Sequence, residues 1–104
     1  MLEIRPNCEW CNRDLPPDSD NARICSYECT YCAGCADDVL HNVCPTCGGG
    51  FAPRPIRPQH AHRDTLALGL ANHPARLDRV HSQWSRAEVD CLTDKLRNID
   101  PARR

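Results

Sequence analysis

The sequence CEWC (8–11), CSYEC (25–29), CAGC (32–35) and CPTC (44–47) decides the fold of this chain. Eight of the nine cysteines stand in these four pairs, with two or three residues between the members of each pair. Such a spacer lets the backbone turn beneath a metal ion so that both sulfurs contact it, and structural Zn²⁺ takes four thiolates at about 2.3 Å. Four pairs supply ligands for two tetrahedral sites. The sequence therefore predicts two Zn²⁺ ions.

A disulfide framework is the alternative explanation for paired cysteines. Such frameworks form in oxidising compartments, usually in proteins with a secretory signal. Residues 1–6 contain no apolar segment typical of such a signal, and no run approaches the roughly 18 apolar residues of a membrane span. We therefore expect a cytoplasmic protein with reduced thiols and no membrane contact. Four-thiolate iron or an iron–sulfur cluster would use the same spacings, but zinc is the first expectation.

The composition leaves little material for a hydrophobic core around the cysteines. The 104 residues include two tryptophans, two tyrosines and one phenylalanine. A structural zinc ion contributes on the order of 10–16 kcal/mol of apparent binding energy, far more than a few buried side chains. We expect the N-terminal half to be unfolded without metal.

The net charge of −1 conceals opposite charges in the two halves of the chain. Residues 1–50 carry three arginines against eight acidic residues, whereas residues 51–104 carry ten basic residues against six acidic ones. An acidic metal-binding half can attract a basic tail within one molecule. We expect the tail either to dock in this way or to keep its charges solvated. Nucleic-acid binding is the alternative, through Arg76, Arg79, Arg86, Lys95, Arg97, Arg103 and Arg104.

The pattern of residues between the cysteine pairs predicts short elements. Alternating residues over 22–29 indicate a hairpin strand, and two acids near the start of 36–42 favour one or two helical turns. Three prolines in 53–58 are typical of an extended, semi-rigid spacer. The expected fold class is a small, metal-stabilised α+β fold followed by a helical segment. Its expected parts are a two-zinc domain over 1–52, a proline-rich linker over 53–60 and a helical basic tail over 61–104.

Two helices are predicted in the tail. The first covers 64–72, and the second opens at Ser85, which stands three residues before Glu88 in a capping-box pattern. Cys91 lies beside the apolar stripe of the second helix, and we expect it to be buried or half-buried. The stripe should pack on the leucines of the tail, with a homodimer as the alternative. It consists of Val89, Leu92, Leu96 and Ile99.

Spacing alone allows two ways of sharing the ligands between two ions. In sequential ribbons, the first two pairs bind one ion and the last two bind the other. In a cross-brace, the first and third pairs (Cys8, Cys11, Cys32, Cys35) share one ion, and the second and fourth pairs (Cys25, Cys29, Cys44, Cys47) share the other.

The order of the cysteines resembles the RING finger. Successive ligands are separated by two, thirteen, three, two, two, eight and two residues, and Tyr31 and Pro45 match an aromatic and a proline of that family. The resemblance implies the cross-brace arrangement. This chain departs from the ubiquitin ligases at two positions. Glu9 stands where they usually carry an aliphatic residue that contacts the conjugating enzyme, and Gly48 stands where they commonly carry a basic residue. Cys29 stands where many RING fingers have histidine.

The N-terminal segment also resembles a family of small bacterial cysteine-rich proteins without an assigned function. The similarity lies in MLEIRPNC (1–8) and CSYEC (25–29) and covers about residues 1–58. It implies a RING-like metal fold and a bacterial cytoplasm.

These observations predict a non-enzymatic, zinc-binding, RING-like module that binds a protein partner. Two four-thiolate sites leave no open coordination position for water or substrate. The first alternative is a ligase-type adaptor that docks a ubiquitin-conjugating-type enzyme, and the second is a nucleic-acid-binding or regulatory zinc protein. The surface expected to meet a partner consists of Trp10, Val39, Leu40 and Pro45.

Overall fold

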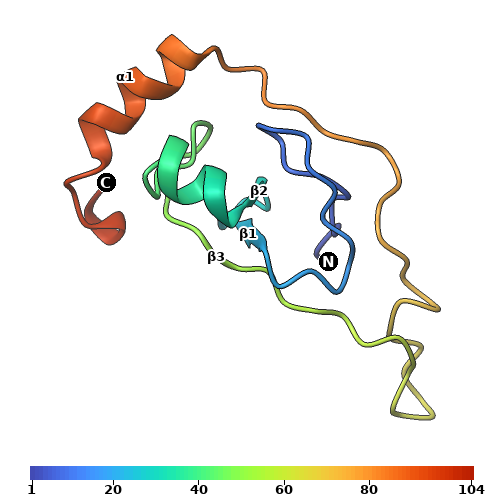
Figure 1. Ribbon diagram of the computed structural model, residues 1–104. Coiled ribbons are helices and arrows are strands. Elements are labelled where there is room, and N and C mark those ends of the chain that lie inside the picture. Colours follow the sequence, from blue (N-terminus) through green and yellow to red (C-terminus); the bar gives the residue numbers. More distant parts are fainter.

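The computed structural model describes all residues from 1 to 104 and contains few regular elements (Figure 1). The strands form one antiparallel sheet in the order β2-β1-β3. Figure 1 shows the sheet and a short helix at the centre, with the longest helix at one end. In chain order the elements are β1 (Ala22–Ile24), β2 (Thr30–Cys32), η1 (Cys35–Val39), β3 (Ala52–Pro53), α1 (Arg86–Leu96) and η2 (Pro101–Arg103).

The hairpin predicted from residues 22–29 is present as β1 and β2. Ala22 pairs with Cys32 and Ile24 with Thr30, so the turn between the strands carries Cys25 and Cys29. The helical turn predicted after the third cysteine pair is also present, as the five-residue π-helix η1. The short elements therefore place cysteines at their ends, where the chain changes direction.

The core is small, and cysteines make up nearly half of its apolar residues. Of the 104 residues, 22 are buried, and six of the fourteen buried apolar residues are cysteines. Tyr31 is the largest fully buried side chain, and its ring packs edge-on against Phe51 with centroids 5.4 Å apart. The core therefore lies at the cysteine clusters, as expected for a chain in which metal replaces part of a hydrophobic interior.

Arg54 ties the predicted linker to the cysteine-rich part of the molecule. Its side chain is 4% exposed and donates to the main-chain oxygens of Arg5 (2.8 Å), Leu15 (3.1 Å) and Pro16 (2.9 Å). Pro53 belongs to β3, which pairs with β1. The prediction of a spacer that begins at residue 53 is therefore wrong, because a buried guanidinium holds this segment against the domain.

The helix predicted over 64–72 is absent. The segment instead folds into a loop closed by hydrogen bonds from Leu70 N to Pro58 O (2.8 Å) and from Ala71 N to Gln59 O (3.1 Å). Gly69 lies at φ +94°, and a Cβ there would come within 2.8 Å of the carbonyl carbon of His60. Both features require glycine, and a positive φ ends a helix. The loop lies at the lower right of Figure 1, away from the sheet.

The predicted docking of the basic tail on the acidic half is confirmed. Arg76 pairs with Glu3 and Arg79 with Asp14, at 3.0 and 2.7 Å. In Figure 1 this part of the tail, drawn in orange, passes the blue N-terminal segment before it reaches α1. The guanidinium of Arg104 also donates to the main-chain oxygens of Asn42 and Gly48.

The predicted capping box at Ser85 and Glu88 is present and opens α1. The helix ends at Leu96, one turn before the predicted stop. No helix of the structure has both the length and the apolar character needed to cross a membrane.

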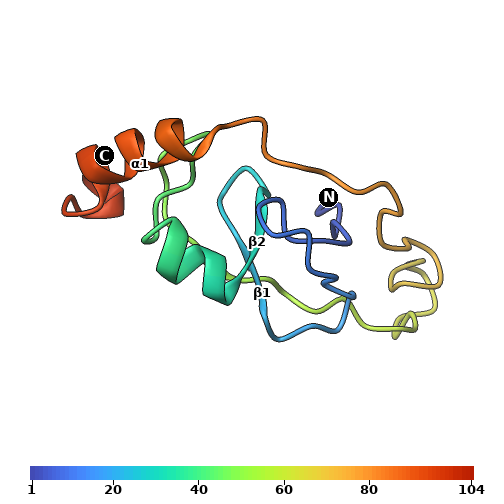
Figure 2. The same ribbon diagram turned by 45° about the horizontal axis from the view of Figure 1, so that its top comes forward.

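The packing partners of α1 differ from the prediction. Val89 belongs to the core cluster, and Thr93 Oγ1 lies 3.5 Å from Leu40 O. At the end of the helix, the Leu96 methyl group lies over the Cα of Gly48. The helix therefore packs on the cysteine-rich half, because the segment 64–72, which contains Leu66, Leu68 and Leu70, forms a loop at the opposite end of the molecule, as Figure 2 shows. Ile99, the last member of the stripe, is exposed.

Replacing Arg54 with methionine tests the role of the buried guanidinium. Arg54→Met leaves the carbonyl oxygens of Arg5 and Leu15 without a donor, at about 1–3 kcal/mol for each unsatisfied group, whereas Pro16 O keeps the amide of Ser19 (2.9 Å). We expect the free energy of unfolding of the metal-loaded protein in urea to fall by at least about 2 kcal/mol. Arg63→Met is the matched control, because Arg63 is exposed and its side chain makes no hydrogen bond. Equal stability of the two variants would contradict the assigned role.

Adding one methyl group at Gly48 tests the docking of α1. Gly48 lies at φ +78°, and a Cβ there would approach Leu96 Cδ1 to 2.9 Å. Gly48→Ala should lower the free energy of unfolding by about 1–2 kcal/mol because alanine is strained at this positive φ. The clash between the added Cβ and Leu96 should lower it further. Gly34→Ala is the control, since a Cβ at Gly34 meets nothing within 4 Å. Thermal unfolding of both variants would distinguish them, and a stable Gly48→Ala protein would contradict the packing.

Candidate metal centre

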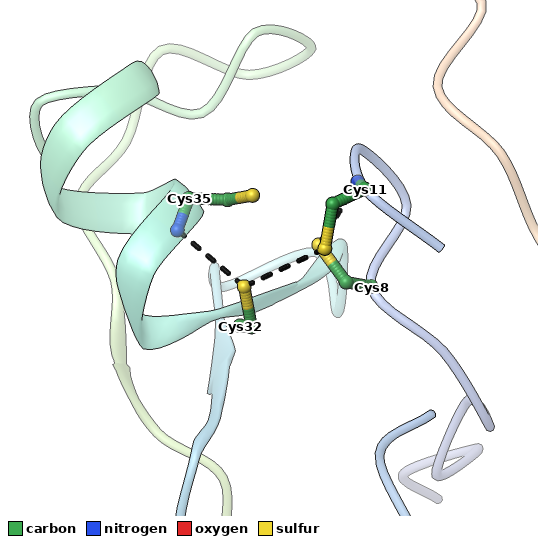
Figure 3. A group of neighbouring side chains, drawn as sticks. All are labelled: Cys8, Cys11, Cys32 and Cys35. Carbon is green, nitrogen blue, oxygen red and sulfur yellow. Dashed lines mark hydrogen bonds between the residues drawn. The ribbon is translucent and has the colours of Figure 1, made fainter. Parts of the chain in front are cut away.

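The first cysteine cluster combines the first and third pairs. The Sγ atoms of Cys8, Cys11, Cys32 and Cys35 all lie within 4.8 Å of one another. Cys8 and Cys11 come from the N-terminal loop, Cys32 from the end of β2 and Cys35 from the start of η1. Figure 3 shows the four sulfur atoms gathered between these elements.

Local backbone geometry shapes the two turns of this cluster. The amide of Cys11 points at Cys8 Sγ (3.5 Å) and that of Cys35 at Cys32 Sγ (3.4 Å), as the dashed lines of Figure 3 show. Asn12, directly after the first pair, lies at φ +66° and turns the chain back. An amide that donates to sulfur favours the thiolate over the thiol. These turns therefore support sulfur in the form that binds metal.

The second cluster combines the second and fourth pairs. The Sγ atoms of Cys25, Cys44 and Cys47 lie within 4.8 Å of one another. Cys29 lies outside this tightest group, but Cys25 and Cys44 lie close enough to its thiol to lower its pKa. The predicted fourth ligand of this centre, Cys29, is therefore near the cluster but not part of the observed group. Amides again point at sulfur, from Tyr27 to Cys25 (3.3 Å) and from Gly49 to Cys47 (3.4 Å).

The electrostatics of each cluster favour a cation. Interactions with the thiols of Cys25 and Cys44 lower the pKa of Cys29 to about 3, and interactions with Cys25 and Cys29 raise the pKa of Cys44 well above that of an ordinary thiol. In the first cluster, burial raises the pKa of both Cys8 and Cys35. Without a cation, closely spaced thiolates repel one another, so the sulfurs cannot all ionise. A divalent cation removes this repulsion and deprotonates its ligands.

The geometry of the sulfur atoms fits zinc. Four ligands at about 2.3 Å in a tetrahedron lie about 3.8 Å from one another. Cys11 Sγ and Cys32 Sγ are 3.8 Å apart, although they come from different pairs. The first cluster can therefore hold one Zn²⁺ with little rearrangement, and the second has the same kind of donors.

The two observed groups alternate along the chain and contain seven of the eight paired cysteines. Cys8 and Cys11 meet Cys32 and Cys35, whereas Cys25 meets Cys44 and Cys47. No group joins the first pair to Cys25, which the sequential arrangement would require. Cys32 of the first cluster ends β2, and Cys25 of the second cluster lies in the turn that leads into β2. The position of one cluster therefore depends on the other.

The surface predicted to meet a partner is largely covered. Leu40 and Pro45 are buried, and Val39 and Trp10 are half-buried and pack against the core. Leu40 lies beneath α1, and Pro45 lines a groove beside it. The prediction of a partner surface is therefore wrong for Leu40 and Pro45, because the tail of the same chain occupies that position.

Two buried polar residues beside the first pair were not predicted. The carboxylate of Glu9 accepts from Arg5 (2.9 Å) and from the amide of Thr30, which fixes the first turn to β2. The side chain of Asn7 is fully buried and bonds to both main-chain polar groups of Val80. The contact with Val80 joins Asn7 to the distant tail, so no local pattern could have identified it.

The two grooves of the structure contain no arrangement typical of catalysis. The larger, of 550 Å³, lies beside Cys25 and is lined mainly by apolar residues and prolines, including Ile24, Phe51 and Pro55. The smaller, of 430 Å³, lies between Pro45 and α1. Cys91 lines it and is exposed, which corrects the expectation that this side chain would be buried or half-buried.

Comparisons with known proteins agree with the cysteine-rich character of the chain. A family described as "Protein of unknown function (DUF1272)" matches residues 1–57. An uncharacterized protein of Rhizobium meliloti (strain 1021) is 52% identical over 80 residues, which cover 77% of this chain and 86% of the relative. No solved structure matches the chain. The match over more than half of the chain and the similarity to this relative show that the protein belongs to the DUF1272 family.

Proposed function

We propose that this protein is a two-zinc, RING-like module that binds a protein partner and performs no chemistry of its own. The observation that carries the proposal is the gathering of seven of the eight paired cysteines into two sulfur clusters. With Cys29 as the eighth ligand, the two clusters would form the cross-brace that the RING resemblance implies. Each ion would join segments far apart in the sequence, from Cys8 to Cys35 and from Cys25 to Cys47.

The ligand sets support a structural rather than a catalytic role for zinc. Catalytic zinc usually has three protein ligands and an open position, whereas four thiolates close the coordination shell. Each cluster would provide four thiolates. Neither groove brings a general base to a cluster, and the acid of the smaller groove, Glu88, already forms the capping box with Ser85. Zinc bound here would stabilise the fold.

The contacts of the tail weigh against the two alternative functions. Docking of a conjugating enzyme would use Leu40 and Pro45, which are buried, and Glu9, whose carboxylate is held by Arg5. Nucleic-acid binding would use the tail arginines, but Arg76 and Arg79 are paired with acids. We therefore favour a protein partner recognised by another surface.

Metal content and metal removal test the structural role of zinc. Native mass spectrometry of protein purified without added metal should show two zinc ions per chain, and cobalt substitution should give a tetrahedral four-thiolate spectrum. Removal of zinc by a chelator should unfold residues 1–54, because the small core cannot replace the binding energy of the metal. Loss of amide dispersion in NMR spectra would report this unfolding. Iron in place of zinc, or a metal-free chain that stays folded, would contradict the proposal.

Single cysteine variants test which thiols hold the ions. Cys32→Ser should retain one zinc ion, because the second cluster keeps all its ligands. Cys91→Ser is the matched control and should retain two, because Cys91 belongs to neither cluster. Two firmly bound ions in Cys32→Ser, measured by the same mass spectrometry, would remove Cys32 from the ligand set.

A further inference from the structure

An extended segment of the tail, residues 76–82, lies along the first cysteine turn; we name this segment the strap. Arg76 N donates to the main-chain oxygens of Glu3 and Ile4, at 3.2 and 3.1 Å, and Ser82 N donates to Glu9 O at 2.8 Å. Both views of the ribbon show the strap beside the N-terminal segment (Figures 1 and 2). The strap therefore bonds at both ends to the main chain of the cysteine-rich half.

Asn7 fixes the centre of the strap by its main chain. Asn7 Nδ2 donates to Val80 O (2.8 Å), and Asn7 Oδ1 accepts from Val80 N (3.0 Å). The same amide group is fully buried and also donates to Cys8 O and to Asn12 Oδ1. This bidentate contact recognises one residue of any extended chain, because it uses only that residue's peptide groups.

Two arginines supply the side-chain contacts of the strap. Arg76 donates to Glu3 at 3.0 Å. The guanidinium of Arg79 donates to Asp14 Oδ1 (2.7 Å), to Asn12 Oδ1 (2.9 Å) and to Asn12 O. Three donors of one planar group are used, and lysine cannot reproduce this fork. The site for Arg79 is therefore selective for arginine.

The other side chains of the strap contribute little to its binding. Leu77 is 90% exposed, and Asp78 and His81 are also exposed. The two ion pairs are themselves partly exposed, and such pairs add little stability. Binding therefore depends on a short series of main-chain hydrogen bonds and on two arginines three residues apart. A segment held in this way can open locally at low cost.

We name the surface that binds the strap the strap groove; it is separate from the two grooves described above. The strap groove and the strap differ in their relation to the family. All groove residues (Glu3, Ile4, Asn7, Glu9, Asn12 and Asp14) lie within the part that matches the family, residues 1–57, whereas the strap lies beyond it. The groove thus belongs to the cysteine-rich domain itself. The strap lies outside residues 1–57, although the 80 residues shared with the Rhizobium meliloti relative extend beyond them.

We propose that this groove is a binding site for an extended segment of a partner protein that carries two arginines three residues apart, and that the strap occupies it in the absence of the partner. The groove would bind the main chain of the partner at Asn7 and its arginines at Glu3 and at Asn12 and Asp14. The proposal rests on the proposed function and names the surface and the partner class of that function. A partner can bind only those molecules in which the strap has left the groove. Its apparent affinity is therefore the intrinsic affinity multiplied by the fraction of molecules with an open groove.

A labelled peptide with the sequence of residues 74–84 tests the proposal on the zinc-loaded full chain by fluorescence anisotropy. Arg76→Ala combined with Arg79→Ala weakens the strap, and we expect this double variant to bind the peptide at least about tenfold more tightly than the unaltered chain. Arg63→Ala with Arg103→Ala is the matched control, since neither side chain contacts the groove, and it should bind as the unaltered chain does. A peptide with alanine at both arginine positions should lose binding.

Groove variants in the weakened-strap background complete the test. Asp14→Asn should reduce peptide binding about two- to fivefold without affecting the fold, because Asp14 is largely exposed and the change removes an exposed ion pair that only a bound arginine completes. Asn7→Ala should abolish binding, and its zinc content and NMR dispersion show whether it remains folded. No binding to the double variant, or binding that Asp14→Asn leaves unchanged, would overturn the proposal. Dimers of the unaltered chain that Asp14→Asn dissociates would assign the groove to the strap of a second copy and would also overturn it.

Zinc measured on the same samples separates this inference from the proposed function. Two zinc ions per chain without peptide binding would overturn the groove and leave the metal-stabilised fold intact. Peptide binding by a chain that holds no zinc would support the groove and contradict the proposed function.

Discussion

The arrangement of the whole molecule depends on bringing mutually repelling sulfur atoms together. The thiols of the first cluster lie within 4.8 Å of one another, and three of its four cysteines are buried. Four thiolates at such distances are stable only around a cation, and a protonated cluster would leave a small core with little cohesion. Two bound zinc ions would satisfy this requirement and would fix both ends of the hairpin and the start of η1. The surrounding hydrogen bonds, such as those of Glu9 and Arg54, then act on a frame that the metal defines.

The tail has a second role beyond covering the core. The strap binds near the first cysteine turn, whereas α1 and Arg104 bind near the last one, so that the tail spans the molecule from one cluster to the other. The two contacts differ in kind. The strap is held by main-chain hydrogen bonds and two arginines, while α1 buries Val89 and packs Leu96 on Gly48. This difference allows the strap to open while α1 remains docked.

Local signals in the sequence predicted the features that depend on neighbours along the chain. The spacing of the cysteines indicated two clusters that could hold metal, and the pattern at Ser85 and Glu88 located the start of α1. Charge asymmetry correctly indicated that the tail docks on the N-terminal half. Each of these signals acts within a few residues or through overall charge, so each can be read before the fold is known.

Features that depend on distant partners were missed or predicted incorrectly. Residues 64–72 have an apolar pattern typical of a helix, but Gly69 adopts a positive φ and packs against the backbone of His60. Arg54 looked like part of a spacer, and only the three carbonyl oxygens that surround it explain its burial. The apolar stripe of α1 was visible, but its partner Leu40 was expected to be exposed. In each case the decisive contact joins segments that the sequence does not place together.

The central claim is that two ions share the eight cysteines in an interleaved way, and NMR of the protein loaded with ¹¹³Cd tests it most directly. Scalar coupling between each cadmium nucleus and the cysteine β-protons identifies the ligands of each ion individually. The structure predicts two cadmium resonances, one coupled to Cys8, Cys11, Cys32 and Cys35 and the other to Cys25, Cys29, Cys44 and Cys47. A resonance coupled to Cys8, Cys11, Cys25 and Cys29 would contradict this account, because it would require a sequential arrangement of the ligands and a different fold.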